Sequence, residues 1–266
     1  MKKYPMLYKR SSTGKISTWM VEVEDNKFRT ISGFSDGLKI TSDWTLCEGK
    51  SYNTSNQQAI KQASSLHKKK ADLGAFENID DIDNKTPFKP MLAKDWAKEK
   101  RKATYPIASQ PKLDGVRCVI KSDGMWTRTG KELVSSPHVW NSIKGIFDAH
   151  PDLVLDGELY CDKLANDFNK IISCVRKTKP KLEDIKESEK YIEFFCYDYY
   201  DGESTPLSER CNNLEDLFEL STYNYIRVVP TVILKNITEV EFQFDKYIHE
   251  GYEGQILRVL DSIYEC

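Results

Sequence analysis

Residues 76–90, FENIDDIDNKTPFKP, divide the chain into two parts with different hydrophobic patterns. The segment is acidic, contains two prolines and has no hydrophobic periodicity, which is typical of a linker. We therefore expect residues 1–75 to form a small module and residues 91–266 to form a separate, larger domain. The chain has 266 residues, of which 39% are hydrophobic and 11% aromatic, so it is long enough to build a core for each part.

The first part predicts an antiparallel β-meander followed by one helix. In STWMVEVE, apolar side chains alternate with their neighbours as in a half-buried strand, and the turn sequences DN and SDG lead into two further strands. Ser55 is followed three residues later by Gln58, the spacing of a capping box. This spacing predicts a helix that begins at Ser55 and ends at Gly74.

Charge is unevenly distributed along the chain. Residues 1–75 contain 13 Lys/Arg and 7 Asp/Glu, whereas the rest contains 26 and 34, so the net charge of −2 combines a basic module with an acidic body. A basic module favours a nucleic-acid partner. The lysines of LHKKK are equally consistent with a simpler role, because cations stabilise the C-terminal end of a helix.

Cysteine usage and hydropathy exclude several classes of protein. The seven cysteines are scattered, odd in number and without a C-x-x-C pair, which argues against a disulfide framework or a zinc site and favours a reducing compartment. No apolar run approaches the roughly 18 residues of a membrane span, and MKKYPMLYKR lacks the apolar region of a signal peptide. We therefore predict a cytoplasmic protein with no membrane partner.

From residue 91 onward the pattern is mixed α/β. CVIKSDGMWTRTG predicts a hairpin with SDG at its tip, DLVLDGELY and YIEFFCYDYY predict buried strands, and RVVPTVIL predicts one further strand. PLSERCNNLEDLFEL predicts an amphipathic helix. A second helix is predicted by an apolar stripe at helical spacing, formed by Phe168, Ile171, Ile172 and Val175.

Lys112, in QPKLDGVRC, lies where a buried strand should end, and an uncompensated buried ammonium costs on the order of several kcal/mol. It is either an exposed turn residue or a reactive amine in a pocket. A K-x-D-G sequence alone is weak evidence for the second. Four further short sequences follow it in order: TRTG at 127–130, LDGELY at 155–160, FFCYDYY at 194–200 and YEGQILR at 252–258.

This ordered set resembles the nucleotidyltransferase domain of ATP-dependent DNA ligases of the short bacteriophage type. KLDGVR resembles motif I, DGELY motif III, FFCYDYY motif IIIa and EGQILR motif IV, and PMLA and PLSER are similar to other stretches of these enzymes. The resemblance covers about residues 88–260 and implies an α+β fold built on antiparallel sheets, like other ATP-grasp-type ligases. Residues 1–75 more loosely resemble the small WGR-like module that precedes this domain in some phage ligases.

The resemblance implies a covalent mechanism. AMP would pass from ATP to Lys112, then to the 5′-phosphate of a DNA nick, and the 3′-hydroxyl would displace it; the amine has to be neutral when it attacks. Gln110 would read the adenine edge by accepting from the exocyclic amine and donating to a ring nitrogen, although many relatives have Glu here. Tyr197 would stack on the adenine ring.

The remaining residues of the implied site handle the charged end of ATP. Arg117 and Arg128 match arginines that hold phosphate or ribose oxygens, for which a guanidinium is well suited. Glu158 matches the acid that binds the ribose hydroxyl and helps to orient a metal, and Asp156 shares its face of the strand. Glu253 matches the carboxylate that supports a divalent cation, for which Mg²⁺ is expected.

A basic strip surrounds the predicted helix at 168–175. It could bind duplex DNA through phosphates, or it could be an ordinary solvated face. The resemblance implies nicked double-stranded DNA as the partner of a monomeric enzyme. The strip consists of Lys170, Arg176, Lys177, Lys179 and Lys181.

The family pattern also includes a later pair of lysines, one residue apart, and an oligonucleotide-binding-fold domain. No such pair follows Glu253 before Cys266. We therefore expect a C-terminally incomplete adenylation domain, arising from truncation, a split gene or degeneration, and completed in the second case by a separately encoded fragment. We also expect this chain alone to seal nicks poorly, with weak self-adenylation remaining.

Two other functions stay open at this point. An RNA ligase or an mRNA-capping guanylyltransferase would keep the covalent lysine and change the substrate, which labelling with ATP or GTP and sealing of a DNA or RNA nick would separate. A non-catalytic DNA-binding protein would use the N-terminal module and the basic strip. Strongly salt-dependent binding without a covalent nucleotide adduct would identify it.

Overall fold

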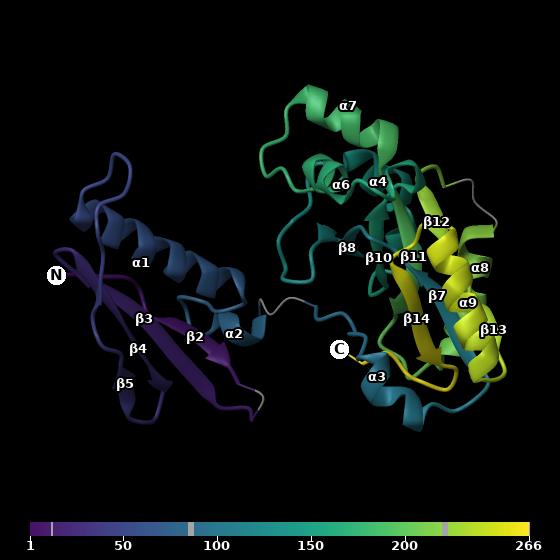
Figure 1. Ribbon diagram of the computed structural model, residues 1–266, viewed down its shortest axis with the longest axis horizontal. Coiled ribbons are helices and arrows are strands. Elements are labelled where there is room, and N and C mark those ends of the chain that lie inside the picture. Colours follow the sequence, from purple (N-terminus) through teal and green to yellow (C-terminus); the bar gives the residue numbers. More distant parts are fainter. Residues whose placement is uncertain (12, 85–87, 220–222, 266) are drawn as a thin grey trace. The chain divides into compact units, whose positions relative to one another are not determined.

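The computed structural model describes residues 1–11, 13–84, 88–219 and 223–265. The chain forms two compact units, residues 1–88 and 89–266, each with its own sheet structure and core (Figure 1). Among the described residues, no helix combines the length and apolar character needed to cross a membrane.

The first unit is an antiparallel sheet with a helix packed on one face (Figure 1). Ala59 and Ala63 of α1 (Ser55–Asp72) form a core with Val21, Val23 and Phe28, which confirms the predicted meander and helix. The strands are β1 (Lys2–Lys3), β2 (Leu7–Arg10), β3 (Ile16–Glu24), β4 (Lys27–Phe34), β5 (Lys39–Thr41) and β6 (Thr45–Leu46).

The capping of α1 differs by one residue from the prediction. Thr54, rather than Ser55, is the N-cap: its hydroxyl accepts from the backbone N–H of Gln57 at 3.3 Å, and the Gln57 side chain accepts from the backbone N–H of Thr54 at 2.8 Å. Both candidate pairs have the same spacing, so the sequence did not distinguish them. At the other end, Gly74 follows the helix with φ +78°, as a C-terminal glycine should.

Residues 76–84, which the sequence assigns to a linker, pack on the first unit. Phe76 exchanges backbone hydrogen bonds of 2.7 and 2.9 Å with Tyr8 of β2. Ile82, in the short helix α2 (Asp81–Asn84), is buried. The backbone pairing of Phe76 and the burial of Ile82 hold this acidic segment in place. Residues 85–87 lie outside the described part of the chain.

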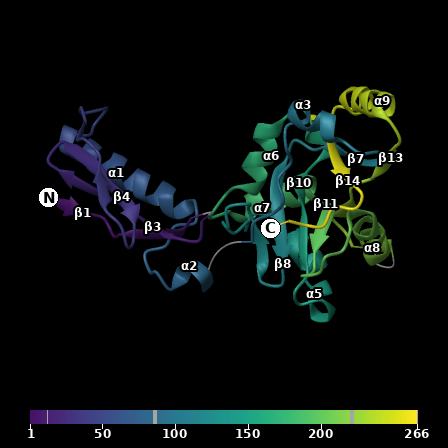
Figure 2. The ribbon, with the colours of Figure 1, turned by 90° about the horizontal axis from the view of Figure 1, so that it is seen from below.

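The second unit contains two sheets (Figures 1 and 2). The larger has the order β12-β11-β10-β8-β9 and the smaller has the order β13-β7-β14; all the neighbouring strands are antiparallel except β11 and β12. The strands are β7 (Ile107–Lys112), β8 (Val116–Lys121), β9 (Gly124–Trp126), β10 (Val154–Tyr160), β11 (Glu193–Tyr200), β12 (Ile226–Val228), β13 (Val232–Leu234) and β14 (Gly254–Val259).

Helices cover the sheets of the second unit. Figure 2 shows α6 near β10 and α8 near β11, and the apolar stripe of α6 contributes Ile171 and Val175 to the main core, as predicted. Val240 of α9 packs with Ile107 and Leu234 of the smaller sheet. The helices are α3 (Trp96–Glu99), α4 (Pro137–Ile143), α5 (Ile146–Ala149), α6 (Phe168–Val175), α7 (Leu182–Tyr191), α8 (Leu207–Glu219) and α9 (Ile237–His249), with 3-10 turns at Lys100–Lys102 and Asp162–Leu164.

The motif-bearing strands lie next to one another. The SDG hairpin joins β8 to β9, and β10 lies between β8 and β11, with Asp156 opposite Asp198. PLSERCNNLEDLFEL forms α8, although Leu220, its last residue, lies outside the described residues. The predicted α+β class, built on antiparallel sheets, is confirmed.

The prediction of one strand over RVVPTVIL is wrong. The stretch forms β12, parallel to β11 in the larger sheet, and then β13, antiparallel to β7 in the smaller sheet. Pro230 lies between them, and proline has no N–H to donate to a strand neighbour. The chain therefore passes from one sheet to the other at this point, which places Thr231 between the sheets.

Gly157, the glycine of DGE, permits the close approach of β10 and β11. A Cβ at this position would lie 2.4 Å from the Phe195 carbonyl oxygen and 2.6 Å from the Phe194 ring. We predict that Gly157→Ala lowers the free energy of unfolding by about 2 kcal/mol through overpacking. Urea denaturation measures this, with Gly145→Ala as the control because a Cβ there meets nothing within 4 Å. Equal stability of the two variants would contradict the prediction.

Candidate active site

A cavity of about 690 Å³ lies in the second unit, lined by residues from strands of both sheets and by the segment at 91–94. The structure brings together at this cavity most of the residues singled out in the sequence. They are Gln110, Lys112, Arg117, Glu158, Tyr197 and Glu253. They converge because β7 pairs with β14 in one sheet while β8, β10 and β11 are neighbours in the other.

Lys112 ends β7 at the cavity, and its surroundings resolve the problem of a lysine at the end of a buried strand. The backbone N–H of Glu253 donates to the Lys112 carbonyl at 3.0 Å, so strand pairing places the two side chains together. The Lys112 ammonium forms an ion pair with the Glu253 carboxylate, and the two side chains are 42% and 46% exposed. The amine is thus neither deeply buried nor uncompensated, and it faces the cavity.

Arg117 forms a bidentate ion pair with the buried carboxylate of Asp156. Its Nε and Nη2 donate to the two oxygens of Asp156 at 3.0 and 2.6 Å, and Nη2 also donates to the Met91 carbonyl at 2.6 Å. Burial alone would lower the pKa of Arg117, but the hydrogen bonds and charge of Asp156 raise it overall. The guanidinium lies 5.7 Å from the centre of the Tyr197 ring. Arg117 is therefore a fixed positive group in the cavity wall.

Glu158 has an unusual titration. Burial raises its pKa from 4.5 to about 8; Asp156 and Asp114 also raise it, whereas Arg117 and Lys112 oppose the increase. Glu158 lies opposite Arg117 in the β8–β10 pairing. A pKa in this range keeps the group mainly as an uncharged acid at neutral pH. A bound cation would shift it to the carboxylate.

Gln110 is 3% exposed and lines the cavity from β7. Its amide nitrogen donates to the Tyr197 carbonyl at 3.2 Å and to the Thr231 hydroxyl at 3.0 Å. The sequence predicts that this amide both accepts from adenine and donates to it. In this structure both amide hydrogens are directed to protein atoms. Only the amide oxygen therefore remains to interact with adenine, by accepting a hydrogen bond.

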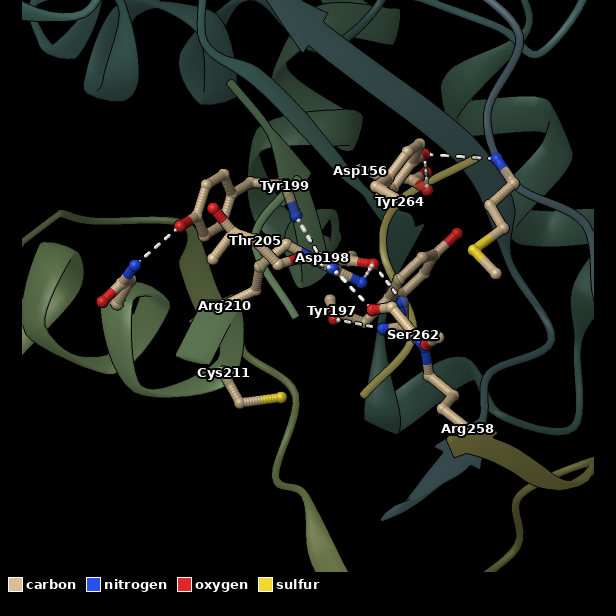
Figure 3. Close-up of polar contacts among 12 residues, drawn as sticks. Asp156, Tyr197, Asp198, Tyr199, Thr205, Arg210, Cys211, Arg258, Ser262 and Tyr264 are labelled. Carbon is tan, nitrogen blue, oxygen red and sulfur yellow. Dashed lines mark hydrogen bonds and ion pairs between the residues drawn. The ribbon is translucent and has the colours of Figure 1, made fainter. Parts of the chain in front are cut away.

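A second buried carboxylate, Asp198, was not singled out in the sequence (Figure 3). Arg210 of α8 donates to its two oxygens at 2.7 and 3.2 Å, and Arg258 of β14 forms an ion pair with it. Arg258 also donates to the Tyr197 carbonyl at 3.1 Å. The available signal was an aspartate within a buried strand, since such a charge needs a partner. PLSER and EGQILR supply the two arginines.

Tyr264 was also missed, because a lone tyrosine carries no motif. Its hydroxyl donates to Asp156 at 2.6 Å and accepts from the Met91 backbone N–H at 3.3 Å (Figure 3). Residues distant in sequence are thereby joined beside the cavity. The same hydroxyl reinforces the carboxylate that orients Arg117.

Arg128, predicted to hold phosphate or ribose, lies on the exposed turn after β9 and does not line the cavity.

The basic strip around α6 is partly neutralised by acidic side chains of α7. Lys170 pairs with Glu187, and Lys177 pairs with Asp184. Arg176 and Lys179 are exposed.

The carboxylates that line the cavity suit a magnesium ion that is also coordinated by the phosphates of a nucleotide. Within the described parts of the chain, no three His, Cys, Asp or Glu side chains form a ready metal cage. Glu158 and Glu253, however, both line the cavity and offer hard oxygen ligands. Mg²⁺ typically uses one or two carboxylates and completes its shell with water and substrate phosphates, so the residues fit this ion.

Two largely antiparallel sheets meet at a cavity that contains Lys112, which is the arrangement that the motif resemblance implies for a nucleotidyltransferase domain. The model of the ATP-dependent DNA ligase domain matches residues 90–266. The chain is 27% identical over 193 residues to a DNA ligase of Thermococcus onnurineus, covering 67% of this chain and 34% of that protein. It is 24% identical over 305 aligned positions to a DNA ligase of African swine fever virus, covering 98% and 69%.

The Chlorella virus DNA ligase–adenylate shares the fold, with a TM-score of 0.53 at 19% identity over 67% of this chain and 63% of that one. The chain belongs to the ATP-dependent DNA ligase family, as the sequence motifs predict. It spans about a third of the archaeal relative and a larger part of the viral ones.

The raised pKa of Glu158 predicts a pH effect on stability. Between about pH 5 and pH 8 the folded chain keeps a proton on Glu158 that the unfolded chain releases, so the free energy of unfolding should fall as pH rises. Glu158→Gln should remove this contribution and show a shallower fall in urea denaturation across that range. Glu241→Gln, at an exposed position on α9, is the control and should follow the wild type. Identical pH profiles for all three proteins would contradict the assignment.

Proposed function

We propose that this chain carries out the lysine-adenylation chemistry of a DNA ligase. Lys112 Nζ attacks the α-phosphorus of ATP, a P–N bond to AMP forms, and the bond to pyrophosphate breaks. The observation that carries the proposal is the position of Lys112, whose amine faces the cavity in contact with Glu253. The ammonium has to lose its proton before the amine attacks, and the partial exposure of the Lys112–Glu253 pair leaves that proton a route to solvent.

The other cavity residues support recognition of ATP. Tyr197 provides an aromatic face for a base, held by the Arg258 contact to its carbonyl. The amide oxygen of Gln110 would accept a hydrogen bond from the edge of the base. The Arg117 guanidinium, held by Asp156, provides a positive charge in the same cavity. Glu158 and Glu253 would hold Mg²⁺, which on binding would neutralise phosphate charge.

The substrate of the later steps is proposed to be nicked duplex DNA. The AMP would move from Lys112 to the 5′-phosphate of the nick, and the 3′-hydroxyl would then displace AMP and close the phosphodiester. The names of the curated relatives support DNA over RNA, and we propose a monomer as the acting form. The buried free thiols, among them Cys118 and Cys196, suit action in a reducing cytoplasm.

The basic first unit is proposed as a further DNA contact of the WGR-like type. Lys27 Nζ and Arg29 Cζ lie 4.7 and 4.4 Å from the centre of the Trp44 ring. Cations beside an aromatic side chain are residue types that nucleic-acid-binding surfaces use. In this unit Lys27 also pairs with Glu24 and Arg29 with Glu22.

Replacement of the nucleophile tests the adenylation step. We predict that the wild-type chain retains label from [α-³²P]ATP, but not from [γ-³²P]ATP, after denaturing electrophoresis. Lys112→Ala should lose the label completely. Lys121→Ala is the matched control, because Lys121 ends β8 and pairs with Asp123 away from the cavity. Label retained by Lys112→Ala would contradict the proposal.

The ion pairs of the strip predict which basic residues contact DNA phosphates. Arg176 and Lys179 are exposed, whereas Lys170 and Lys177 are paired with α7. The double substitution Arg176→Ala/Lys179→Ala should reduce the slope of log K against log salt for duplex DNA by about 0.9 per lost contact. Lys170→Ala/Lys177→Ala should change it less. Fluorescence anisotropy at several salt concentrations measures this slope. A larger change in slope for Lys170→Ala/Lys177→Ala than for Arg176→Ala/Lys179→Ala would contradict the assignment.

A further inference from the structure

A short chain of hydrogen bonds beside the cavity fixes what Gln110 can offer to a ligand. The amide nitrogen donates to the Tyr197 carbonyl at 3.2 Å and to Thr231 Oγ1 at 3.0 Å. An amide nitrogen carries two hydrogens, one for each of these acceptors. Both donors of Gln110 are therefore used within the protein, and the amide oxygen is the polar atom that remains for a ligand.

The Tyr197 carbonyl determines which way the amide is turned. A backbone carbonyl can only accept, so the opposite orientation would place the amide oxygen against another oxygen. Arg258 Nη1 donates to the same carbonyl at 3.1 Å and holds it in place (Figure 3). The assignment of nitrogen and oxygen in Gln110 thus follows from the chemistry of its neighbours.

Thr231 supplies the second contact because of the break between β12 and β13. The chain changes sheets at Pro230, and Val232 then pairs with Ser109, the neighbour of Gln110 on β7. The Thr231 hydroxyl lies 3.8 Å from the Cys211 sulfur. With its hydrogen directed to the sulfur, the hydroxyl presents a lone pair to Gln110.

We propose that Thr231 is a positioning residue that makes Gln110 an acceptor-only contact and so selects a 6-amino purine over a 6-oxo purine. The inference rests on the proposed function, in which the cavity holds the base of ATP. A 6-amino group donates to the Gln110 oxygen. A 6-oxo group would place a second acceptor there, and a buried acceptor pair without a hydrogen is strongly disfavoured.

Substitution of Thr231 tests the proposal through a ratio of rates. Thr231→Val keeps the shape but removes the acceptor, so only Tyr197 then resists rotation of the amide. We expect the ratio of adduct formation from ATP and inosine triphosphate, both subsaturating, to fall by roughly three- to tenfold, the effect of one hydrogen bond. Thr231→Ser should restore the wild-type ratio because it keeps the hydroxyl.

Purine riboside triphosphate, which has no 6-substituent, separates positioning from a general defect. Its rate of adduct formation should be the same in wild type, Thr231→Val and Thr231→Ser. If Thr231→Val does not fold, Thr231→Ala provides the same comparison with a smaller side chain. Circular dichroism of each variant establishes that the folded proteins are being compared.

Two results would overturn the inference while leaving the proposed function intact. One is an unchanged ratio in Thr231→Val, in a wild type that reacts with ATP. The other is an equal loss of rate with all three nucleotides, which would make Thr231 a structural residue only. A wild type that forms no adduct with any nucleotide would instead refute the proposed function, and this inference with it.

Discussion

The buried carboxylate of Asp198 joins the two sheets of the second unit. Arg210 and Asp198 are each 1% exposed, and Arg258 reaches the same carboxylate from β14. Removing one partner from such a buried pair typically costs about 3–5 kcal/mol, because a charge is left uncompensated. The ion pairs of Asp198 therefore fix β14 against β11. They also fix the separation of Glu253 from Tyr197, which both line the cavity. The cavity, and every contact proposed for ATP, depends on this separation.

A second carboxylate repeats the arrangement one strand away. Asp156 lies opposite Asp198 in the β10–β11 pairing and is held by Arg117 and Tyr264. The two acid–arginine clusters form a rigid wall, so the groups that have to respond to ligand lie elsewhere. These are the half-exposed Lys112–Glu253 pair and Glu158, whose pKa of about 8 makes its charge sensitive to a bound cation.

The sequence predicted much of this site because the ligase motifs lie on regular strands. DGELY and FFCYDYY lie in almost continuously buried strands, so their assignment as strands followed from their apolar composition, and the motif resemblance then implied their place at the cavity. Arg128 could not be placed in the same way, since it lies on a turn whose direction depends on tertiary packing. Tyr264 and Thr231 were missed because their importance arises from partners distant in the chain. Under the proposal made for Thr231, Gln110 would present only an acceptor to the base, as the Glu found at this position in many relatives does.

Identification of the modified side chain tests the central claim most directly. The chain would be incubated with ATP and Mg²⁺, digested, and mapped by mass spectrometry for a peptide that carries AMP. The account predicts one adduct, on Lys112, linked through Nζ. An adduct on another residue, or ATP bound with no covalent product, would contradict the account of this cavity as an adenylation site.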